Sequence, residues 1–286
     1  TDRTNPPLAQ VQPMSARRTV VIGANGQLGT ALKPLLPDAE FLSREDIDLA
    51  DPATIENFDW TGVGAVINAA ADTDVDGAET PEGRRRAWAV NVGGSVALAK
   101  QAIAHGFTLV AVSSDYVFDG EEPEHDVAEP VAPLGVYGQT KAASEAVVAT
   151  VPKHYIVRTS WVVGEGKNFL DTMRKLARDG ASPTVVDDQF GRLTPAADLA
   201  EGVVRLLDER PPYGIVHITG DGPVTTWWQI ARDVFESEGR DPNDVQAVST
   251  EAWAASQLRP ISPRPKYGTL RVEIPDAPTS FETNGA

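Results

Sequence analysis

Residues 19–29 read Thr-Val-Val-Ile-Gly-Ala-Asn-Gly-Gln-Leu-Gly, and this stretch decides the fold class of the 286-residue chain. Its first four residues are mostly β-branched and predict a buried strand. A helix is predicted from Gln27 to Leu36. The turn between them has glycines spaced as G-x-x-G-x-x-G, so the backbone can turn tightly and approach a pyrophosphate closely. Strand, glycine turn and helix in this order indicate dinucleotide binding rather than a purely structural loop.

Strands and helices continue to alternate beyond this unit. Strands are predicted at 40–42, 65–68, 108–113, 154–158 and 215–218, and helices at 92–105, 137–150, 169–178, 197–209 and 227–238. Because the strands before residue 160 are almost continuously apolar, both faces of their sheet must be covered. The predicted fold class is therefore α/β: a Rossmann-type doubly wound parallel sheet with a smaller C-terminal substrate-binding domain.

Three segments are predicted along the chain. The NAD(P)-binding Rossmann domain spans 17–160, and 161–286 is mainly the substrate-binding domain, with a part at about 192–220 that returns to the Rossmann domain. Residues 1–16 are polar, punctuated by proline and without a periodic pattern. This is typical of a linker or of the remnant of an upstream segment.

Composition narrows the classes of partner. The chain carries 25 Lys and Arg against 41 Asp and Glu, a net charge of −16, which argues against nucleic acid or an anionic membrane as a partner. The absence of cysteine excludes disulfides, thiolate catalysis and thiolate metal sites, and it fits a cytoplasmic protein. No apolar run is long enough to span a bilayer, and the four histidines lack metal-ligand spacing, so neither a membrane span nor a metal site is predicted.

Tyr137 is the only one of five tyrosines that has a lysine, Lys141, four positions later. On a helix this spacing places both side chains on one face. The lysine cation would favour the phenolate and pull the tyrosine pKa from about 10 toward neutrality, where the phenol can exchange a proton. By itself such a pair is more often a solvated helix face, so its meaning depends on the rest of the chain.

The residues after the second strand bear on the choice of cofactor. NAD-binding domains usually have an acidic residue here that binds the ribose hydroxyls, whereas this chain has Ser43 and Arg44. A hydroxyl and a guanidinium suit a 2′-phosphate, which favours NADPH. The neighbouring Glu45 and Asp46 keep NADH open as an alternative.

Several strings occur in an order that is specific to one family. Besides the glycine turn they are NAAADTDVDGAE (68–79), SSDYVFDG (113–120), VYGQTK (136–141), RTSWV (158–162), DQFG (188–191) and TTW (225–227). With these strings, roughly residues 18–270 resemble the extended short-chain dehydrogenase/reductase family. The C-terminal end departs from the family pattern, because Arg264-Pro265 is followed by Lys266-Tyr267-Gly268-Thr269 and no closing helix is predicted after it.

The resemblance implies roles for single residues. The implied catalytic residues are Ser114, Tyr137 and Lys141, and the implied contacts of a nucleotide-sugar are Ser114, Asp115 and Trp161. The implied cofactor-binding residues are Gly23, Gly26, Gln27, Leu28, Gly29, Ser43, Arg44, Asp48, Leu49, Ala71, Asp72, Thr73, Asn91, Tyr137 and Lys141. Ser114 stands where the family usually has threonine, so the hydroxyl is kept and a methyl group is lost.

The resemblance also implies a reaction, the NADPH-dependent reduction of the C4 ketone of dTDP-4-dehydro-L-rhamnose to dTDP-L-rhamnose. Tyr137 would donate its proton to the carbonyl oxygen, and Lys141 would hold the nicotinamide ribose and stabilise the phenolate. Ser114 would donate a hydrogen bond to the same oxygen. Asn91 would hold the local helix geometry and a water molecule that relays the proton.

Two alternatives to this reaction stay open. Another nucleotide-sugar reductase or epimerase of the extended family would use the same tyrosine and lysine. A reductase-like regulatory subunit of another enzyme would have no need of an intact Ser114, Tyr137 and Lys141. A dTDP-sugar is the expected partner. The resemblance is compatible with a homodimer, with Mg²⁺ and with fusion to an upstream pathway domain.

Overall fold

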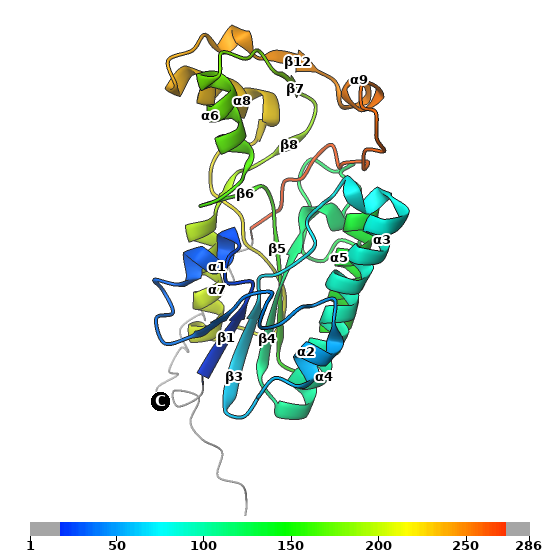
Figure 1. Cartoon of the computed structure of the whole chain (residues 1–286), viewed down its shortest axis with the longest axis vertical. Helices are drawn as coiled ribbons and strands as arrows, with labels where there is room; N and C mark the ends of the chain where they lie inside the picture. The colour runs from blue at the N-terminus through cyan, green and yellow to red at the C-terminus, as the bar shows by residue number, and fades with distance from the viewer. Residues whose placement is uncertain (1–17, 273–286) are drawn as a thin grey trace, which may run out of the picture.

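The computed structural model of the chain describes residues 18–272 (Figure 1). The predicted linker at 1–16 and the end of the C-terminal tail lie outside the described residues. None of the helices within 18–272 has both the length and the apolar character needed to cross a bilayer.

The core of the molecule is one six-stranded sheet in which every neighbouring pair of strands is parallel. In spatial order its strands are β10 (Gly214–His217), β5 (His154–Thr159), β4 (Thr108–Ser114), β3 (Val63–Asn68), β1 (Arg18–Ile22) and β2 (Glu40–Leu42). From β1 the chain turns first to β2 on one side and then to β3 and β4 on the other. This reversal of direction confirms the predicted doubly wound α/β fold.

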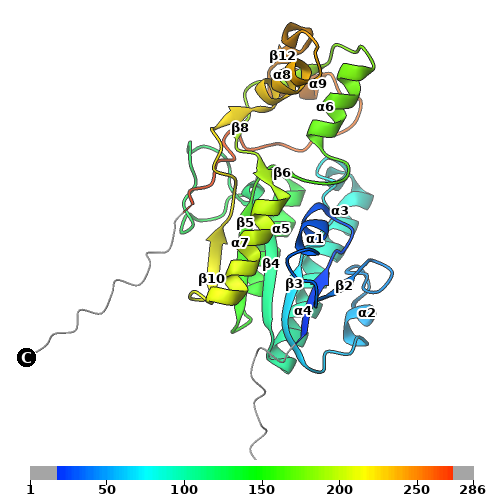
Figure 2. The ribbon, with the colours of Figure 1, turned by 90° about the vertical axis from the view of Figure 1, so that its left-hand side faces the viewer.

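Helices cover both faces of this sheet because successive strand residues point to opposite sides. On one face, α1 (Gln27–Leu32) and α7 (Ala196–Glu209) pack against Val21 and Ile67 (Figure 2). On the other face, α4 (Gly94–His105) and α5 (Val136–Val148) pack against alternate strand residues such as Val20 and Val66. The short helices α2 (Pro52–Glu56) and α3 (Pro81–Ala87), which were not predicted, belong to the same side of the molecule.

A smaller lobe lies beyond the carboxyl ends of the strands (Figure 1). Its core joins α6 (Phe169–Arg178) to α8 (Trp227–Ser237) around the fully buried Phe235. The remaining elements of this part are β6 (Val162–Val163), β7 (Thr184–Val186), β8 (Phe190–Gly191), β9 (Thr194–Pro195), β11 (Thr225–Thr226), β12 (Gln246–Val248) and α9 (Thr250–Ala255). Strands β7 and β12 pair in parallel, and β8 pairs with β11.

Residues from both predicted domains meet in the main sheet. Strand β10 pairs with β5, and α7 packs against α1, although both come after residue 192 in the chain. The boundary at residue 160 itself stays a prediction.

Two predicted helices have different bounds in the structure. The helix predicted from Gln27 to Leu36 ends at Leu32, because the chain then closes a tighter turn with the Leu35 amide donating to the Leu32 carbonyl. The helix predicted at 92–105 is preceded by a π-helical turn, Trp88–Gly93. A π turn holds one more residue than an α turn and is frequent at functional sites.

Candidate active site

A cavity of about 1050 Å³ opens at the carboxyl ends of the strands. Loops that follow β1, β2, β3, β4 and β5 all contribute to its wall, as expected for a doubly wound sheet. The predicted site residues that line it are Gly23, Gly26, Gln27, Leu28, Ser43, Arg44, Asp48, Leu49, Ala71, Asp72, Thr73, Ser114, Asp115, Tyr137, Lys141 and Trp161. Gly29 and Asn91 do not line it.

The glycine turn is tight because three chain segments meet at it. Gly23 has a left-handed φ of +96°, and a Cβ on it would lie 2.8 Å from the Ala70 nitrogen after β3. A Cβ on Gly29 would lie only 2.1 Å from the Gly23 carbonyl oxygen, so α1 can pack onto the turn only with glycine there. Gly29 therefore packs against the turn on the side away from the cavity, while Gly26 and Gln27 line the cavity.

The loop after β2 holds its charged groups in internal pairs. The Ser43 hydroxyl donates to Asp46 at 2.9 Å, and the Arg44 guanidinium contacts the Asp48 carboxylate at 3.2 Å. Hydrogen bonds from the Ser43 amide and hydroxyl lower the pKa of Asp46. Arg44 is largely exposed, so it can turn toward a ligand in the cavity by giving up only a weak surface ion pair.

Asn91 joins the loop after β3 to helix α5. Its Oδ1 accepts from the Asp72 amide at 2.8 Å, and its Nδ2 donates to the Asp72 carbonyl and to the Thr140 hydroxyl on α5. The π-helical turn places this buried side chain between the two segments. Both amide protons are used in these bonds, so Asn91 holds the loop after β3 against α5 instead of lining the cavity.

Ser114 and Tyr137 approach the cavity from two different elements. Ser114 is the last residue of β4, and its hydroxyl donates to Oδ1 of Asp115 at 2.8 Å. Tyr137 lies in the first turn of α5, and its ring meets that of Tyr116 edge to face at 5.5 Å. Burial raises the pKa of Tyr137 above its ordinary value, the charges of Asp115 and Tyr116 raise it further, and Ser114 lowers it.

This pKa contradicts the expectation that Lys141 would pull Tyr137 toward neutrality. The Lys141 ammonium donates to the Val112 carbonyl of β4 at 2.6 Å. It is not among the largest influences on Tyr137. Burial lowers the pKa of Lys141 itself to about 8, and the carboxylate of Glu145 opposes that shift. In the structure, Tyr137 is therefore a protonated phenol, and the buried Lys141 side chain lies one helical turn further along α5.

Asp115 is a buried carboxyl group at the centre of the site. Burial raises its pKa to about 7, although the hydrogen bond from Ser114 works in the opposite direction. The backbone of Gly268 covers it, since a Cβ there would lie 2.4 Å from Oδ2. The unusual string Lys266-Tyr267-Gly268-Thr269 thus has a glycine where a larger residue would clash with Asp115.

Gly268 belongs to a segment that we name the C-terminal strap, residues 262–271. The strap pairs with two distant parts of the chain: the Phe190 amide donates to the Lys266 carbonyl at 2.7 Å, and the His125 amide donates to the Thr269 carbonyl at 2.9 Å. Sequence reasoning treated this region only as an atypical tail. Its proline content and lack of period gave no signal that its backbone would cover Asp115, and no residue of the strap lines the cavity itself.

Trp161 has the strained backbone that is common at functional sites. Its φ is +44°, a left-handed value that is rare for an aromatic residue. Its ring stacks on Trp227 with centroids 3.9 Å apart, and a Cβ on Gly191 would lie 2.6 Å from it. The ring is therefore fixed by the smaller lobe, while the residue still lines the cavity.

Arg86 is a charged cavity residue that the sequence analysis missed. Its guanidinium pairs with the carboxylate of Asp72 and contacts that of Asp74 at 3.0 Å. The run of three arginines at 84–86 in a chain with few basic residues was a signal that could have identified it. Within residues 18–272, no group of three or more acidic or histidine side chains is arranged to hold a metal ion.

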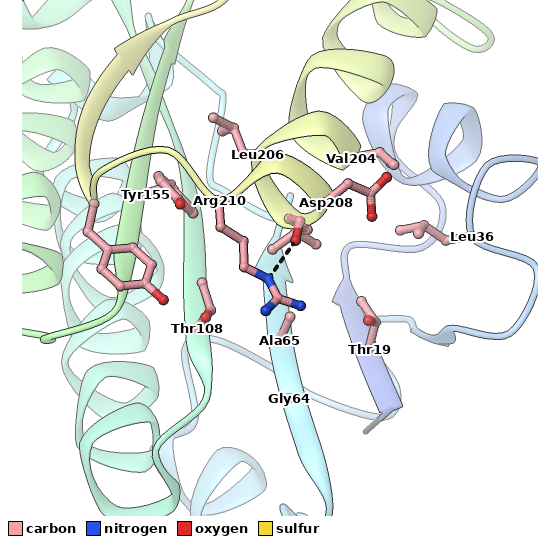
Figure 3. A pocket seen from close by; sticks show the side chains of 12 residues that line it. Thr19, Leu36, Gly64, Ala65, Thr108, Tyr155, Val204, Leu206, Asp208 and Arg210 are labelled. Carbon is pink, nitrogen blue, oxygen red and sulfur yellow. Dashed lines mark hydrogen bonds between the residues drawn. The ribbon is translucent and has the colours of Figure 1, made fainter. Parts of the chain in front are cut away.

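A second cavity, of about 310 Å³, lies at the opposite end of the sheet (Figure 3). It is walled by the amino ends of the strands and by the end of α7, with Tyr155, Thr108 and Leu206 among its lining residues. Arg210 donates from Nε to the Leu207 carbonyl at 3.4 Å there. No residue of the predicted site belongs to this cavity.

Comparisons with known proteins agree with one another. The model of the RmlD substrate binding domain family matches residues 17–282. A dTDP-4-dehydrorhamnose reductase of Mycobacterium tuberculosis is 41% identical over 267 residues, covering 89% of this chain and 85% of the relative. A dTDP-4-keto-6-deoxy-D-glucose reductase of Streptomyces niveus is 36% identical over 252 residues, covering 85% and 86%. The crystal structure of a Bacillus anthracis dTDP-4-dehydrorhamnose reductase in complex with NADP is similar with a TM-score of 0.81 and 31% identity, covering 90% of this chain and 91% of that one.

Proposed function

The chain belongs to the RmlD substrate binding domain family, and from this membership we propose that it reduces the C4 ketone of dTDP-4-dehydro-L-rhamnose to dTDP-L-rhamnose with NADPH. The observation that carries the proposal is the shared cavity: the glycine turn, Ser114, Tyr137 and Lys141 all line one space. This set of groups is what an oxidoreductase that acts on a carbonyl requires.

The geometry of the glycine turn is suited to binding the pyrophosphate of a dinucleotide. Backbone atoms lie exposed at Gly26, where a side chain would stand between the turn and a pyrophosphate. Gly23, Gly26, Gln27 and Leu28 would hold the pyrophosphate, and Arg44 with Ser43 would hold the 2′-phosphate after leaving their carboxylate partners. When bound, NADPH supplies the hydride that the carbonyl carbon accepts.

Tyr137 acts as the acid of the reaction. Because burial raises its pKa, its phenol is protonated at neutral pH and can donate to the oxygen on which negative charge develops. The Ser114 hydroxyl donates a hydrogen bond to the same oxygen. To do so, it turns away from its present acceptor, Oδ1 of Asp115.

Lys141 stabilises the phenolate that remains after the proton has left. Its pKa of about 8 means that it is largely an ammonium at neutral pH. Once Tyr137 is a phenolate, a lysine cation one helical turn away lowers its free energy relative to that of the phenol, by less than burial raises it. Lys141 would also hold the ribose hydroxyls of the nicotinamide half of the cofactor.

Asp115 and Trp161 would contact the sugar. Asp115 has a pKa of about 7, so near neutral pH it can accept a hydrogen bond as a carboxylate or donate one as an acid. Trp161 would offer its edge to the nucleotide-sugar, because Trp227 and Gly191 already contact its ring.

A second candidate substrate is dTDP-4-keto-6-deoxy-D-glucose, favoured by the similarity to the Streptomyces niveus reductase. The two candidate reactions would use the same catalytic residues. They would differ only in the fit of the sugar against Asp115.

Oxidation of NADPH, followed at the absorbance of the reduced nicotinamide, tests the proposal. We expect turnover with dTDP-4-dehydro-L-rhamnose, slower turnover with dTDP-4-keto-6-deoxy-D-glucose, and weaker binding of NADH. Faster turnover of the second sugar would reassign the substrate. No oxidation with either sugar, with NADPH still bound, would favour a regulatory binding subunit.

A further inference from the structure

A buried ion pair lies one helical turn away from Lys141. Arg158 on β5 donates from Nε to Oε1 of Glu145 on α5 at 3.0 Å, and from Nη2 to Oε2 at 2.8 Å. The Ser113 hydroxyl donates to the same Oε1 at 2.5 Å. Arg158 and Glu145 are only 2% and 6% exposed. A pair withdrawn this far from water is tolerated only when its geometry is good and its remaining polar groups are satisfied.

The remaining groups of this pair are indeed satisfied. Arg158 also donates from Nη1 to the Val127 carbonyl at 3.2 Å, and its guanidinium lies over the Phe118 ring at 4.9 Å. Both oxygens of Glu145 accept from Arg158. The arrangement is therefore a fixed, buried network and not an exposed surface ion pair.

The network joins β4 and α5, the two elements that carry the proposed catalytic groups, to β5. Ser113 immediately precedes Ser114 on β4, and Glu145 follows Lys141 by four residues on α5. Arg158 and Ser113 are register partners across the β4–β5 pair. A change in this network would shift the catalytic residues relative to one another.

The charge of Glu145 also acts on the pKa of Lys141. Burial lowers the pKa of Lys141 to about 8, and Glu145 is the charged group that opposes this shift. The other titratable or charged side chains that line the cavity with Lys141 are Arg44, Asp48, Asp72, Asp74, Arg86, Asp115, Tyr116, Tyr137, Glu165 and Lys167. Arg158 holds the Glu145 carboxyl group in place through two hydrogen bonds, a bidentate geometry that fixes the direction of both side chains.

We propose that Glu145, held by Arg158 and Ser113, is a positioning residue for Lys141: it fixes α5 against β4 and β5 and places its carboxylate one helical turn from the Lys141 ammonium. This proposal rests on the proposed function in one respect only. It takes from it that the Lys141 ammonium stabilises the phenolate and binds the cofactor ribose.

The test compares pH profiles of wild type and Glu145→Gln. The neutral amide keeps the shape of the side chain and removes its charge, so the pKa of Lys141 should fall further. We expect the basic limb of the profile to move down by about one pH unit, which makes the loss of turnover at pH 9 about tenfold larger than the loss at pH 6.5. The pKa of Asp115 should stay unchanged in this variant, because Glu145 is not among the main influences on it.

Two further variants keep the test informative if Glu145→Gln folds poorly. Ser113→Ala removes one hydrogen bond to Glu145 and leaves its charge, so it should lower turnover at every pH by loosening the contact of α5 with β4, while the basic limb stays in place. The matched control is Glu238→Gln. Glu238 receives Nε and Nη2 of Arg178 at 2.8 and 3.2 Å, the same bidentate geometry, but in the smaller lobe with Arg178 exposed.

NADPH binding, followed by the fluorescence of the reduced nicotinamide as a function of pH, separates this proposal from the proposed function. If wild type binds NADPH but turns over neither sugar, the proposed function fails, and the shift of the binding profile in Glu145→Gln still decides the role of Glu145. A profile of folded Glu145→Gln that coincides with that of wild type would overturn the proposal, and so would wild-type turnover of Ser113→Ala at every pH. An equal shift in Glu238→Gln would also overturn it.

Discussion

The two ends of the main sheet carry cavities of opposite character. At the carboxyl ends, five loops bring buried ionisable groups into one space of about 1050 Å³, and Asp115 and Lys141 have strongly shifted pKa values there. At the amino ends, a space of about 310 Å³ is walled mainly by strand starts and the last turn of α7 (Figure 3). Its tyrosine, Tyr155, has its hydroxyl bound to the Pro211 carbonyl at 2.6 Å.

The difference between the two ends follows from strand direction. In a parallel doubly wound sheet, the loops after the strands diverge around the switch point and leave room for a ligand. The loops before the strands carry no comparable set of hydroxyl, carboxyl and amine groups here. A cavity is thus a poor guide to function unless it gathers groups that can move a proton.

The largest expected effect tests the phenol at the carboxyl end. Tyr137→Phe removes the proton donor and should reduce turnover about a thousandfold, while NADPH still binds. The control is Tyr155→Phe at the other end, which loses one hydrogen bond to Pro211 and should keep wild-type turnover. Steady-state rates and NADPH titration give both quantities. Equal turnover of Tyr137→Phe and Tyr155→Phe would mean that the two ends of the sheet do not differ in function.

The next effect concerns the buried carboxyl group. The pKa of Asp115 is about 7 in the folded protein and about 4 when unfolded. Its ionisation therefore penalises the folded state progressively between pH 4 and 7 and fully above pH 7. Asp115→Asn cannot ionise, so it should be more stable than wild type by about 2 to 4 kcal/mol at pH 8 and by much less at pH 4. Its turnover should fall.

Urea unfolding of wild type and Asp115→Asn at the two pH values measures this difference. A stability gain that does not depend on pH would mean that the group is not buried as a carboxylate. The comparison matters because the carboxyl group that lines the cavity at the amino end, that of Asp208, is exposed and not buried.

A smaller effect concerns the cofactor. Arg44→Ala should weaken NADPH binding about tenfold and leave NADH binding unchanged, because only NADPH carries the 2′-phosphate that a guanidinium can hold. The matched control is Arg205→Ala, which removes a similar exposed contact, with Glu209, four residues apart on α7. Fluorescence titrations with both nucleotides decide the matter. Equal loss for NADPH and NADH would assign Arg44 a general role instead.

The smallest effect is expected for Arg210→Ala. Arg210 has a left-handed φ of +50° at the end of α7 and makes one long hydrogen bond to Leu207. Its removal should leave turnover unchanged and alter the free energy of unfolding by about 1 kcal/mol at most. A clear loss of turnover would mean that the two ends of the sheet are coupled.

Much of the fold was predictable because its signals are local. Strand β5 and helix α5 were predicted within one or two residues of their observed bounds, since apolar runs and helical periods are read within one segment. Helices α2 and α3 were missed because they are short and have little periodicity. The π-helical turn at 88–93 was missed because it depends on the hydrogen bonds of Asn91 to segments far away in the chain.

The candidate site was predictable in its members but not in its electrostatics. Strings such as VYGQTK identified Tyr137 and Lys141, and both line the cavity. The direction of the Tyr137 pKa was wrong, because burial and the nearby Asp115 are properties of the packed molecule. The network of Glu145, Arg158 and Ser113 likewise joins residues from three elements, and no spacing rule connects them.

The C-terminal strap has a consequence for the order of assembly during synthesis. The residues that cover Asp115 lie near 268, whereas Asp115 itself is made about 150 residues earlier. A ribosome delivers the glycine turn, Ser114, Tyr137 and Lys141 well before the strap can pair with His125 and Phe190. The nascent chain can therefore organise the elements around the glycine turn first, and the cover over Asp115 forms only after the strap has emerged.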